Sequence, residues 1–131
     1  MSGTVVKAAA IPLYVTDGIT QKYRATLTQE TTGITATNGG WYAVTAGNRN
    51  HLDIHPDNDE IYFIHRGTAT IYFNDVPHPI AEGDTVVVPR NVTHYIDNTA
   101  GTTDLELFYI FTPPTQRIDG DTISTLFHRA D

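Results

Sequence analysis

The sequence predicts an all-β protein, built as a small antiparallel sandwich or barrel of the jelly-roll type. Several short runs rich in Val, Ile, Thr, Tyr and Phe are separated by Gly, Pro and Asn, as is typical of such folds. No apolar pattern of helical period and length occurs before the C-terminal tail. No internal repeat divides the 131 residues, so we expect a single domain over residues 1–131.

The first half of the chain supplies three expected segments. Residues 4–14 are expected to be extended, with a turn at residues 17–18. Residues 23–29 alternate apolar with polar side chains, which is the pattern of a half-buried strand. Residues 31–40 are rich in Thr and Gly and are expected to form a loop with at most a short strand. Residues 41–46 then form a strand that leads into a histidine-rich stretch.

The second half supplies the remaining strands. We expect them at residues 61–64, 68–73, 85–88, 93–97 and 105–112, with a turn at residues 74–75. Pro113 and Pro114 end the last of these strands. Residues 123–129 are expected to form a short helix or a final strand.

Composition excludes several kinds of partner and chemistry. The net charge of −7 argues against nucleic acid or an anionic membrane surface as a partner. The absence of cysteine removes disulfides, thiolate ligands and thiol nucleophiles. Residues 8–15 are short and broken by Pro12, so they make a poor signal peptide, and nothing approaches the ~20 apolar residues of a membrane span. We therefore expect a cytoplasmic protein.

Two stretches carry the residues suited to chemistry. His51, Asp53, His55 and Glu60 lie within ten residues of each other, and His94 lies on a later β-type run. On an extended strand, residues two apart point to the same face, so the first three can face one cavity. After a turn at residues 56–59 the chain can return with Glu60 beside them. Because a buried Glu is rare unless it is paired or bound to a metal, these side chains predict a metal site inside the barrel.

The spacing of these residues also resembles the cupin family. The first cupin motif is matched over residues 47–67 by Gly47, Asp53, His55, Glu60 and Gly67. The second is matched over residues 83–98 by Gly83, Pro89, Asn91, His94 and Asn98. The sequence departs from the family pattern at Asp53, which replaces the leading histidine, and at Asn91, which replaces a glycine. Asn tolerates positive φ better than most residues, so the second change suits a turn.

The resemblance implies a cupin-type jelly-roll barrel with one divalent transition metal per chain, Mn, Fe, Ni or Zn. The implied ligands are His55, Glu60, His94 and Asp53. His51 lies on the same strand face as Asp53 and is the alternative ligand, and both residues together are a further option. Whichever of the two is not a ligand is expected to line the pocket as an acid, a base or a partner of a ligand.

Three classes of function follow from the resemblance. The first is an Fe- or Mn-dependent dioxygenase-type oxidoreductase acting on a small organic molecule, which an added anionic ligand favours. The second is a redox-neutral lyase, isomerase or cyclase, in which His51 or a tyrosine such as Tyr62 moves a proton. The third is a module that binds a metal or a small molecule without turnover. In all three, the small molecule would enter the barrel pocket.

Other residues are expected to have ordinary roles. His65 is out of phase with Glu60, His78 lies between two prolines in an expected turn region, and His128 is in the tail. We expect all three on the surface or in packing. Residues 4–29 lie outside the motif-bearing strands, and in cupins such segments commonly pair with a neighbouring chain. A homodimer is therefore expected, because pairing between chains hides a sheet edge.

Overall fold

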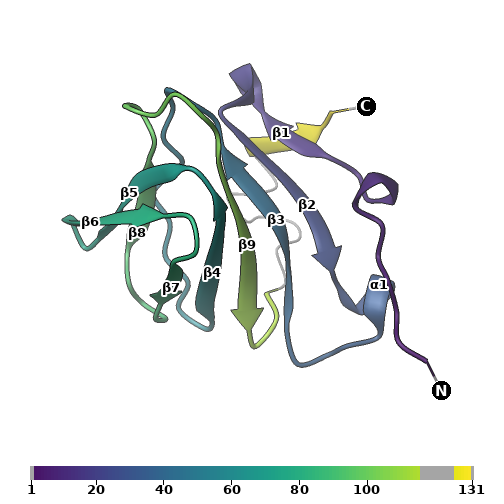
Figure 1. Cartoon of the computed structure of the whole chain (residues 1–131). Coiled ribbons are helices and arrows are strands. Elements are labelled where there is room, and N and C mark those ends of the chain that lie inside the picture. The colour runs from purple at the N-terminus through teal and green to yellow at the C-terminus, as the bar shows by residue number, and fades with distance from the viewer. Residues whose placement is uncertain (1, 116–125, 131) are drawn as a thin grey trace.

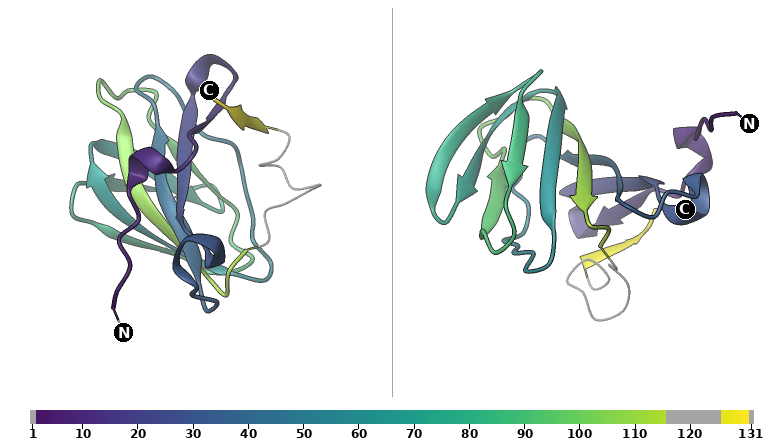
Figure 2. Two further views of the ribbon diagram at one scale, coloured as in Figure 1. Left: turned by 90° about the vertical axis from the view of Figure 1, so that its right-hand side faces the viewer. Right: turned by 90° about the horizontal axis from the view of Figure 1, so that it is seen from below.

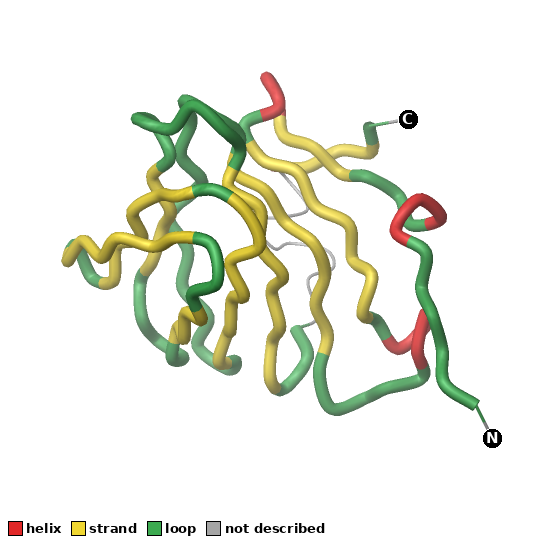
Figure 3. Tube along the Cα trace, in the orientation of Figure 1, coloured by secondary structure: helices red, strands yellow, loops and turns green. Residues whose placement is uncertain are grey.

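The computed structural model describes residues 2–115 and 126–130, and in these residues the predicted all-β antiparallel fold is confirmed (Figures 1 and 3). A seven-stranded sheet has the order β10-β1-β2-β3-β9-β4-β7, and a three-stranded sheet has the order β6-β5-β8. The strands are β1 (Tyr14–Thr16), β2 (Gln21–Leu27), β3 (Asn38–Val44), β4 (Asp59–Arg66), β5 (Thr68–Phe73), β6 (Val76–Ala81), β7 (Thr85–Val88), β8 (His94–Asp97), β9 (Leu105–Thr112) and β10 (Phe127–Arg129). The helical turns described are η1 (Ala8–Ala10), η2 (Asp17–Ile19) and α1 (Gln29–Thr32).

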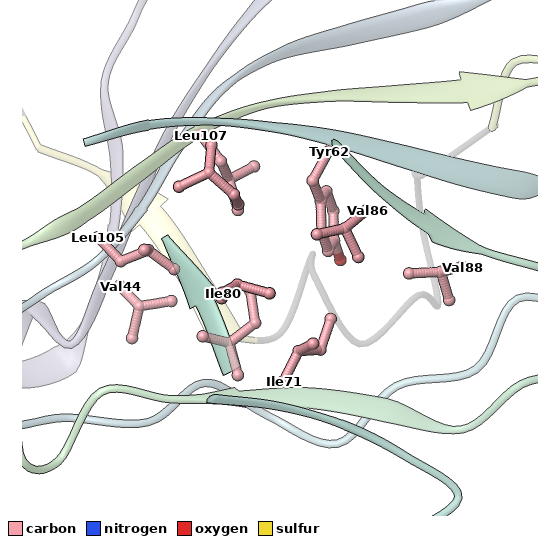
Figure 4. Packing of buried hydrophobic residues seen from close by; sticks show 10 residues of the cluster. Val44, Tyr62, Ile71, Ile80, Val86, Val88, Leu105 and Leu107 are labelled. Carbon is pink, nitrogen blue, oxygen red and sulfur yellow. The ribbon is translucent and has the colours of Figure 1, made fainter. Parts of the chain in front are cut away.

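The two sheets face each other (Figure 2), and the core lies between them, as the packed side chains in Figure 4 show. Side chains alternate along β4: Tyr62 and Ile64 are buried, whereas Phe63 is 46% exposed on the opposite face. Leu105 and Leu107 repeat this spacing on the neighbouring strand β9 and are fully buried. Each fully buried aliphatic or aromatic side chain stabilises the fold by roughly 1.5–3 kcal/mol. This packing holds the two sheets face to face, and the site lies beside it.

The N-terminal region differs from the expected extended segment over residues 4–14. Three consecutive alanines form the 3₁₀ turn η1, and the first strand begins only at Tyr14. The Arg24 guanidinium donates to the carbonyl oxygens of Ala8 and Ile11 at 3.4 and 2.5 Å, which holds this turn against the chain. Strand β1 pairs with β10 and β2 of the same chain.

A short helix occupies part of the segment expected to be a loop. Strand β2 ends at Leu27, and α1 follows at once because Thr28 and Thr31 form a capping box. Gly33 ends this helix with a φ of 76°. The strand expected at residues 41–46 is β3, which begins three residues earlier and ends at Val44.

Strand β6 is absent from the sequence prediction, which placed His78 in a turn. Pro77 and Pro79 pair with Tyr72 and Thr70 of β5, so both prolines belong to a regular antiparallel ladder. Since β6 is an edge strand, prolines two apart can turn their missing N–H groups toward its unpaired side. The predicted turn at residues 74–75 is confirmed as the tight loop between β5 and β6, with positive φ at both positions.

The C-terminal segment is described only in part. Strand β10 falls within the stretch 123–129 that was expected to be a short helix or a strand, and residues 116–125 lie outside the described residues. No helix in the described part of the chain is both long enough and apolar enough to cross a membrane.

Candidate metal centre

Three side chains from separate parts of the chain meet in the interior. The nitrogen and oxygen atoms that His55, Glu60 and His94 could offer to a metal all lie within 4.8 Å of one another. Glu60 Oε1 is 3.5 Å from His55 Nε2 and 3.3 Å from His94 Nε2. Glu60 and His94 are only 5% and 3% exposed. A carboxylate is thus held out of water between two imidazoles, as the sequence predicted for these three residues.

The two sheets bring these residues together. Glu60 lies at the start of β4, where it pairs with Val88 of β7 on one side and with Phe111 of β9 on the other. His94 begins β8 in the opposite sheet. The site therefore spans the space between the sheets, and its two most buried members come from opposite walls.

The segment carrying Asp53 and His55 is not the regular strand that was expected. It lies along β8 through isolated bridges: the backbone N–H groups of Asp53 and His94 each donate to the other residue's carbonyl oxygen at 2.9 Å. The carbonyl oxygen of His55 accepts the N–H of Asn91 at 2.9 Å. These bonds fix the segment against the second motif, so the two stretches that carry the predicted site form one unit.

His94 is held in a defined orientation. Its Nδ1 lies 2.9 Å from the Val92 carbonyl oxygen, and since a carbonyl can only accept, Nδ1 carries the proton. The other ring nitrogen, Nε2, therefore faces Glu60. Burial lowers the pKa of His94, but the hydrogen bond to Glu60 and its negative charge raise it by more, so the pKa lies above its ordinary value.

The hydroxyl of Tyr62 contacts this group. Tyr62 is buried, and its O–H donates to Glu60 Oε1 at 2.8 Å. The structure therefore places this predicted catalytic residue against a candidate ligand, where it orients the carboxylate.

Asp53 lies beside the three-residue group. Its Oδ2 is 3.6 Å from His55 Nε2 and 3.2 Å from His51 Nε2, and its Oδ1 accepts the N–H of Ile54 at 2.9 Å. The other nitrogen of His51 contacts Gln21 at 3.0 Å. Asp53 thus lies between His51 and the buried group.

A cavity of about 410 Å³ opens over the site. Its walls include every residue that was predicted as a ligand or as catalytic. Other wall residues include aromatic and neutral polar side chains, the aliphatic Leu27 and Ile34, and the carboxylate of Glu30. The aromatic and neutral polar members include Tyr23, Tyr42, Asn50, Tyr109, Phe111 and Thr115. The cavity has the size of a small-molecule site.

Sequence reasoning did not find Gln21 and Asn50 as parts of the site. Both are buried polar residues, and Gln21 touches His51 from a strand 30 residues earlier in the chain. Nothing in the local sequence marks either residue, and only the pairing of β2 with β3 brings Gln21 there.

The remaining histidines lie apart from the metal group, as expected. His65 is exposed on β4, and the ring of His78 packs on that of Phe73. His128 Nδ1 is 3.6 Å from an exposed Asp17 carboxylate.

The donor set fits a divalent transition metal. Two imidazoles and one or two carboxylates are ordinary ligands of Mn, Fe, Ni and Zn. A cation would also offset the cost of burying the Glu60 carboxylate. His94 already has the arrangement of a ligand, with one ring nitrogen held by a carbonyl and the other turned to the site.

Comparison with known proteins gives the family. A model of the cupin domain matches residues 37–111, more than half of the chain. The protein SchB of Streptomyces halstedii is 32% identical over 96 residues, which are 73% of this chain and 69% of that protein.

Solved structures show the same fold. A predicted oxalate decarboxylase from Thermotoga maritima has a TM-score of 0.71 and 24% identity, covering 84% of this chain and 99% of its own. KdgF from Halomonas sp. has a TM-score of 0.73 and 12% identity, covering 88% and 97%.

Proposed function

The chain belongs to the cupin family, and on that premise we propose that it is a metal-dependent oxidoreductase that oxidises a small organic molecule with dioxygen. The observation that carries the proposal is the buried group of His55, Glu60 and His94 at the wall of a small-molecule cavity. Asp53 completes the proposed ligand set. Fe or Mn bound there would supply the redox chemistry.

The chain's own residues would bind, orient and move protons around that centre. Tyr62 holds the Glu60 carboxylate through its hydroxyl, and the Val92 carbonyl holds the His94 ring. The aromatic side chains of Tyr109 and Phe111 line the cavity beside the group and limit the access of water. His51, which has one nitrogen toward Asp53, would accept a proton from a bound molecule.

A redox-neutral lyase, isomerase or cyclase is the second candidate. It is favoured by the 3.2 Å contact between His51 Nε2 and Asp53 Oδ2 at the cavity wall, because such a pair can transfer a proton without any oxidant. The two functions differ in their need for oxygen. A library of small organic compounds screened for oxygen uptake, and then for conversion under nitrogen, separates them. Conversion that persists without oxygen would reject the oxidase proposal in favour of the second candidate.

The metal group itself is tested by substitution. We predict that the wild-type protein binds one divalent transition metal per chain and that His94→Ala loses most of it, since it removes a buried nitrogen donor. Metal content is measured by elemental analysis, and circular dichroism checks that the β signal remains. His65→Ala is the matched control, because His65 is exposed on the opposite face of β4. Full metal content in a folded His94→Ala variant would contradict the assignment.

A further inference from the structure

The cavity over the site extends across four neighbouring strands of the large sheet, in the order β4, β9, β3 and β2. The metal group lies at one side of this stretch, because Glu60 belongs to β4. Ala25 and Leu27 line the cavity from β2 at the other side. Neighbouring strands lie about 4.8 Å apart, so the three steps from β4 to β2 span about 14 Å along the sheet. The cavity is therefore long enough for a molecule larger than a single ring.

Aromatic rings cover the part of the cavity nearest the metal group. The ring of Phe111 meets that of His55 edge-on, with 4.9 Å between their centroids, and the rings of Tyr109 and Phe111 meet in the same manner at 5.7 Å. Phe111 and Tyr109 both lie on β9, and both line the cavity. Aromatic side chains pack favourably against other rings, face or edge. This wall thus suits a ring-bearing molecule whose polar end reaches the metal group.

The far part of the cavity has an aliphatic wall. Strand β2 leads directly into α1 (Figure 1), and the wall there includes Ala25 and Leu27 of β2 and Ile34, which follows α1. Ile34 is 47% exposed, so apolar surface is available at this end. Leu27 pairs with Gly39 of β3, which lines the cavity without a side chain. An apolar group placed here would be removed from water.

The charges on the walls are unfavourable for an anion. Apart from the histidines, the charged side chains among the described wall residues are the carboxylates of Asp53 and Glu60 in the metal group and of Glu30 near α1. The two carboxylates of the metal group would balance a divalent cation, so that centre would offer no net positive charge. Burying a carboxylate without a cationic partner costs more free energy than burying a hydroxyl. The walls therefore favour an uncharged molecule.

We propose that this cavity takes an elongated, uncharged molecule with at least two rings, whose polar end reaches the metal group and whose apolar end lies against Ala25, Leu27 and Ile34. Ala25 is then a specificity-determining residue, because its methyl group leaves room for the second ring. The inference rests on the proposed function only in taking the cavity as the substrate site. It concerns binding, which is measured without turnover.

Three probe molecules test the shape and the charge. The full-length protein, metal-free and then zinc-loaded, would be titrated with para-phenylphenol, para-phenylbenzoate and phenol, and binding would be followed by NMR chemical shifts. We expect para-phenylphenol to bind roughly tenfold or more tightly than either of the others, since phenol lacks the second ring and para-phenylbenzoate carries a charge. An affinity for para-phenylbenzoate or for phenol that equals or exceeds that for para-phenylphenol would overturn the proposal.

Substitutions at the far end test the placement of the second ring. Ala25→Leu should lower the affinity for para-phenylphenol by roughly tenfold, because the larger side chain fills the space of that ring, and should leave the affinity for phenol unchanged. Thr26→Leu is the matched control, because Thr26 is the next residue of β2 and is not among the described wall residues. Ile34→Ser changes an exposed residue that the fold does not need, and it should lower the affinity for para-phenylphenol by roughly fourfold, the equivalent of one buried methylene group.

Circular dichroism and metal analysis check that each variant is folded and keeps the metal content of wild type. Wild-type affinity for para-phenylphenol in Ile34→Ser and in every folded Ala25→Leu sample would overturn the proposal, as would an equal loss of phenol binding in these variants. Neither result bears on the metal content of His94→Ala or on oxygen uptake. Failure of this inference is therefore distinguishable from failure of the proposed function.

Discussion

Asp53 has a carboxylate that contacts two histidines at once. Its Oδ2 lies 3.2 Å from His51 Nε2 and 3.6 Å from His55 Nε2. The strand period could not choose between Asp53 and His51 as the further ligand, because residues two apart share a face. In the described residues, Asp53 contacts His55, whereas His51 contacts Asp53 and Gln21. A carboxylate there also adds a charge that neutralises a cation.

Paired substitutions separate the two residues. We predict that Asp53→Ala lowers the metal affinity strongly. The loss should be at least the roughly 10–100-fold that typically follows mutation of a residue hydrogen-bonded to a metal ligand. His51→Ala should leave the metal content nearly unchanged and instead reduce turnover or substrate affinity. Metal content measured on the two purified variants side by side decides the matter. If the His51→Ala variant contained no metal and the Asp53→Ala variant kept its metal, the assignment would be reversed.

The segments between strands explain which residues could be predicted from the sequence. His55, Glu60 and His94 occupy motif positions at fixed spacings from turn residues, and the resemblance of these motifs to the cupin family implied that the three side chains meet. Gln21 comes from β2, and only the long-range pairing of β2 with β3 brings it to His51. Strand β6 was missed because its two prolines normally mark a turn, whereas its place at a sheet edge makes them acceptable.

The turn before β8 offers a prediction at this scale. Asn91 has a φ of 67°, as was expected for a residue that replaces a glycine, and its N–H donates to the His55 carbonyl oxygen. We predict that Asn91→Gly keeps the stability of the protein, whereas Asn91→Val lowers its free energy of unfolding by roughly 1–2 kcal/mol, because a β-branched side chain is strained at positive φ. Urea denaturation measures both variants. Val87→Thr, on an exposed strand position, is the matched control. Equal midpoints for Asn91→Val and wild type would show that this turn carries no such constraint.

At the scale of the molecule, the two sheets form a cavity lined by both polar and apolar side chains, and this cavity lies beside an apolar core. The alternation of apolar and polar residues was sufficient to predict a barrel or sandwich, because one face of each sheet must be buried. The cavity lining was beyond such reasoning. It combines side chains from several strands and from the loop after α1, and their proximity depends on the order of strands in the sheet.

The N-terminal arm, defined here as residues 2–10, is the part of the chain that we propose for assembly. The dimer was expected to use residues 4–29, but β1 and β2 pair within the chain, which leaves the arm as the available portion. Almost all of the arm is exposed, and Val5 is 79% exposed. Arg24 anchors its end through the Ala8 carbonyl. An anchored, exposed segment of this kind is suited to lie against a second copy and cover an edge of its sheet.

We therefore predict a homodimer that depends on this arm. Light scattering at micromolar concentration should give twice the chain mass of 14.5 kDa for the full-length protein. Deletion of residues 2–6 should shift the mass toward the monomer, because it removes Val5 and leaves the Arg24 anchor in place. Val76→Thr, which changes an exposed apolar residue at the far edge of the small sheet, is the control and should remain dimeric. A full-length protein with the mass of one chain that does not change on dilution would contradict the dimer. A dimer that persists after the deletion would place the interface on another surface, since the arm would then contribute no contact that holds the two chains together.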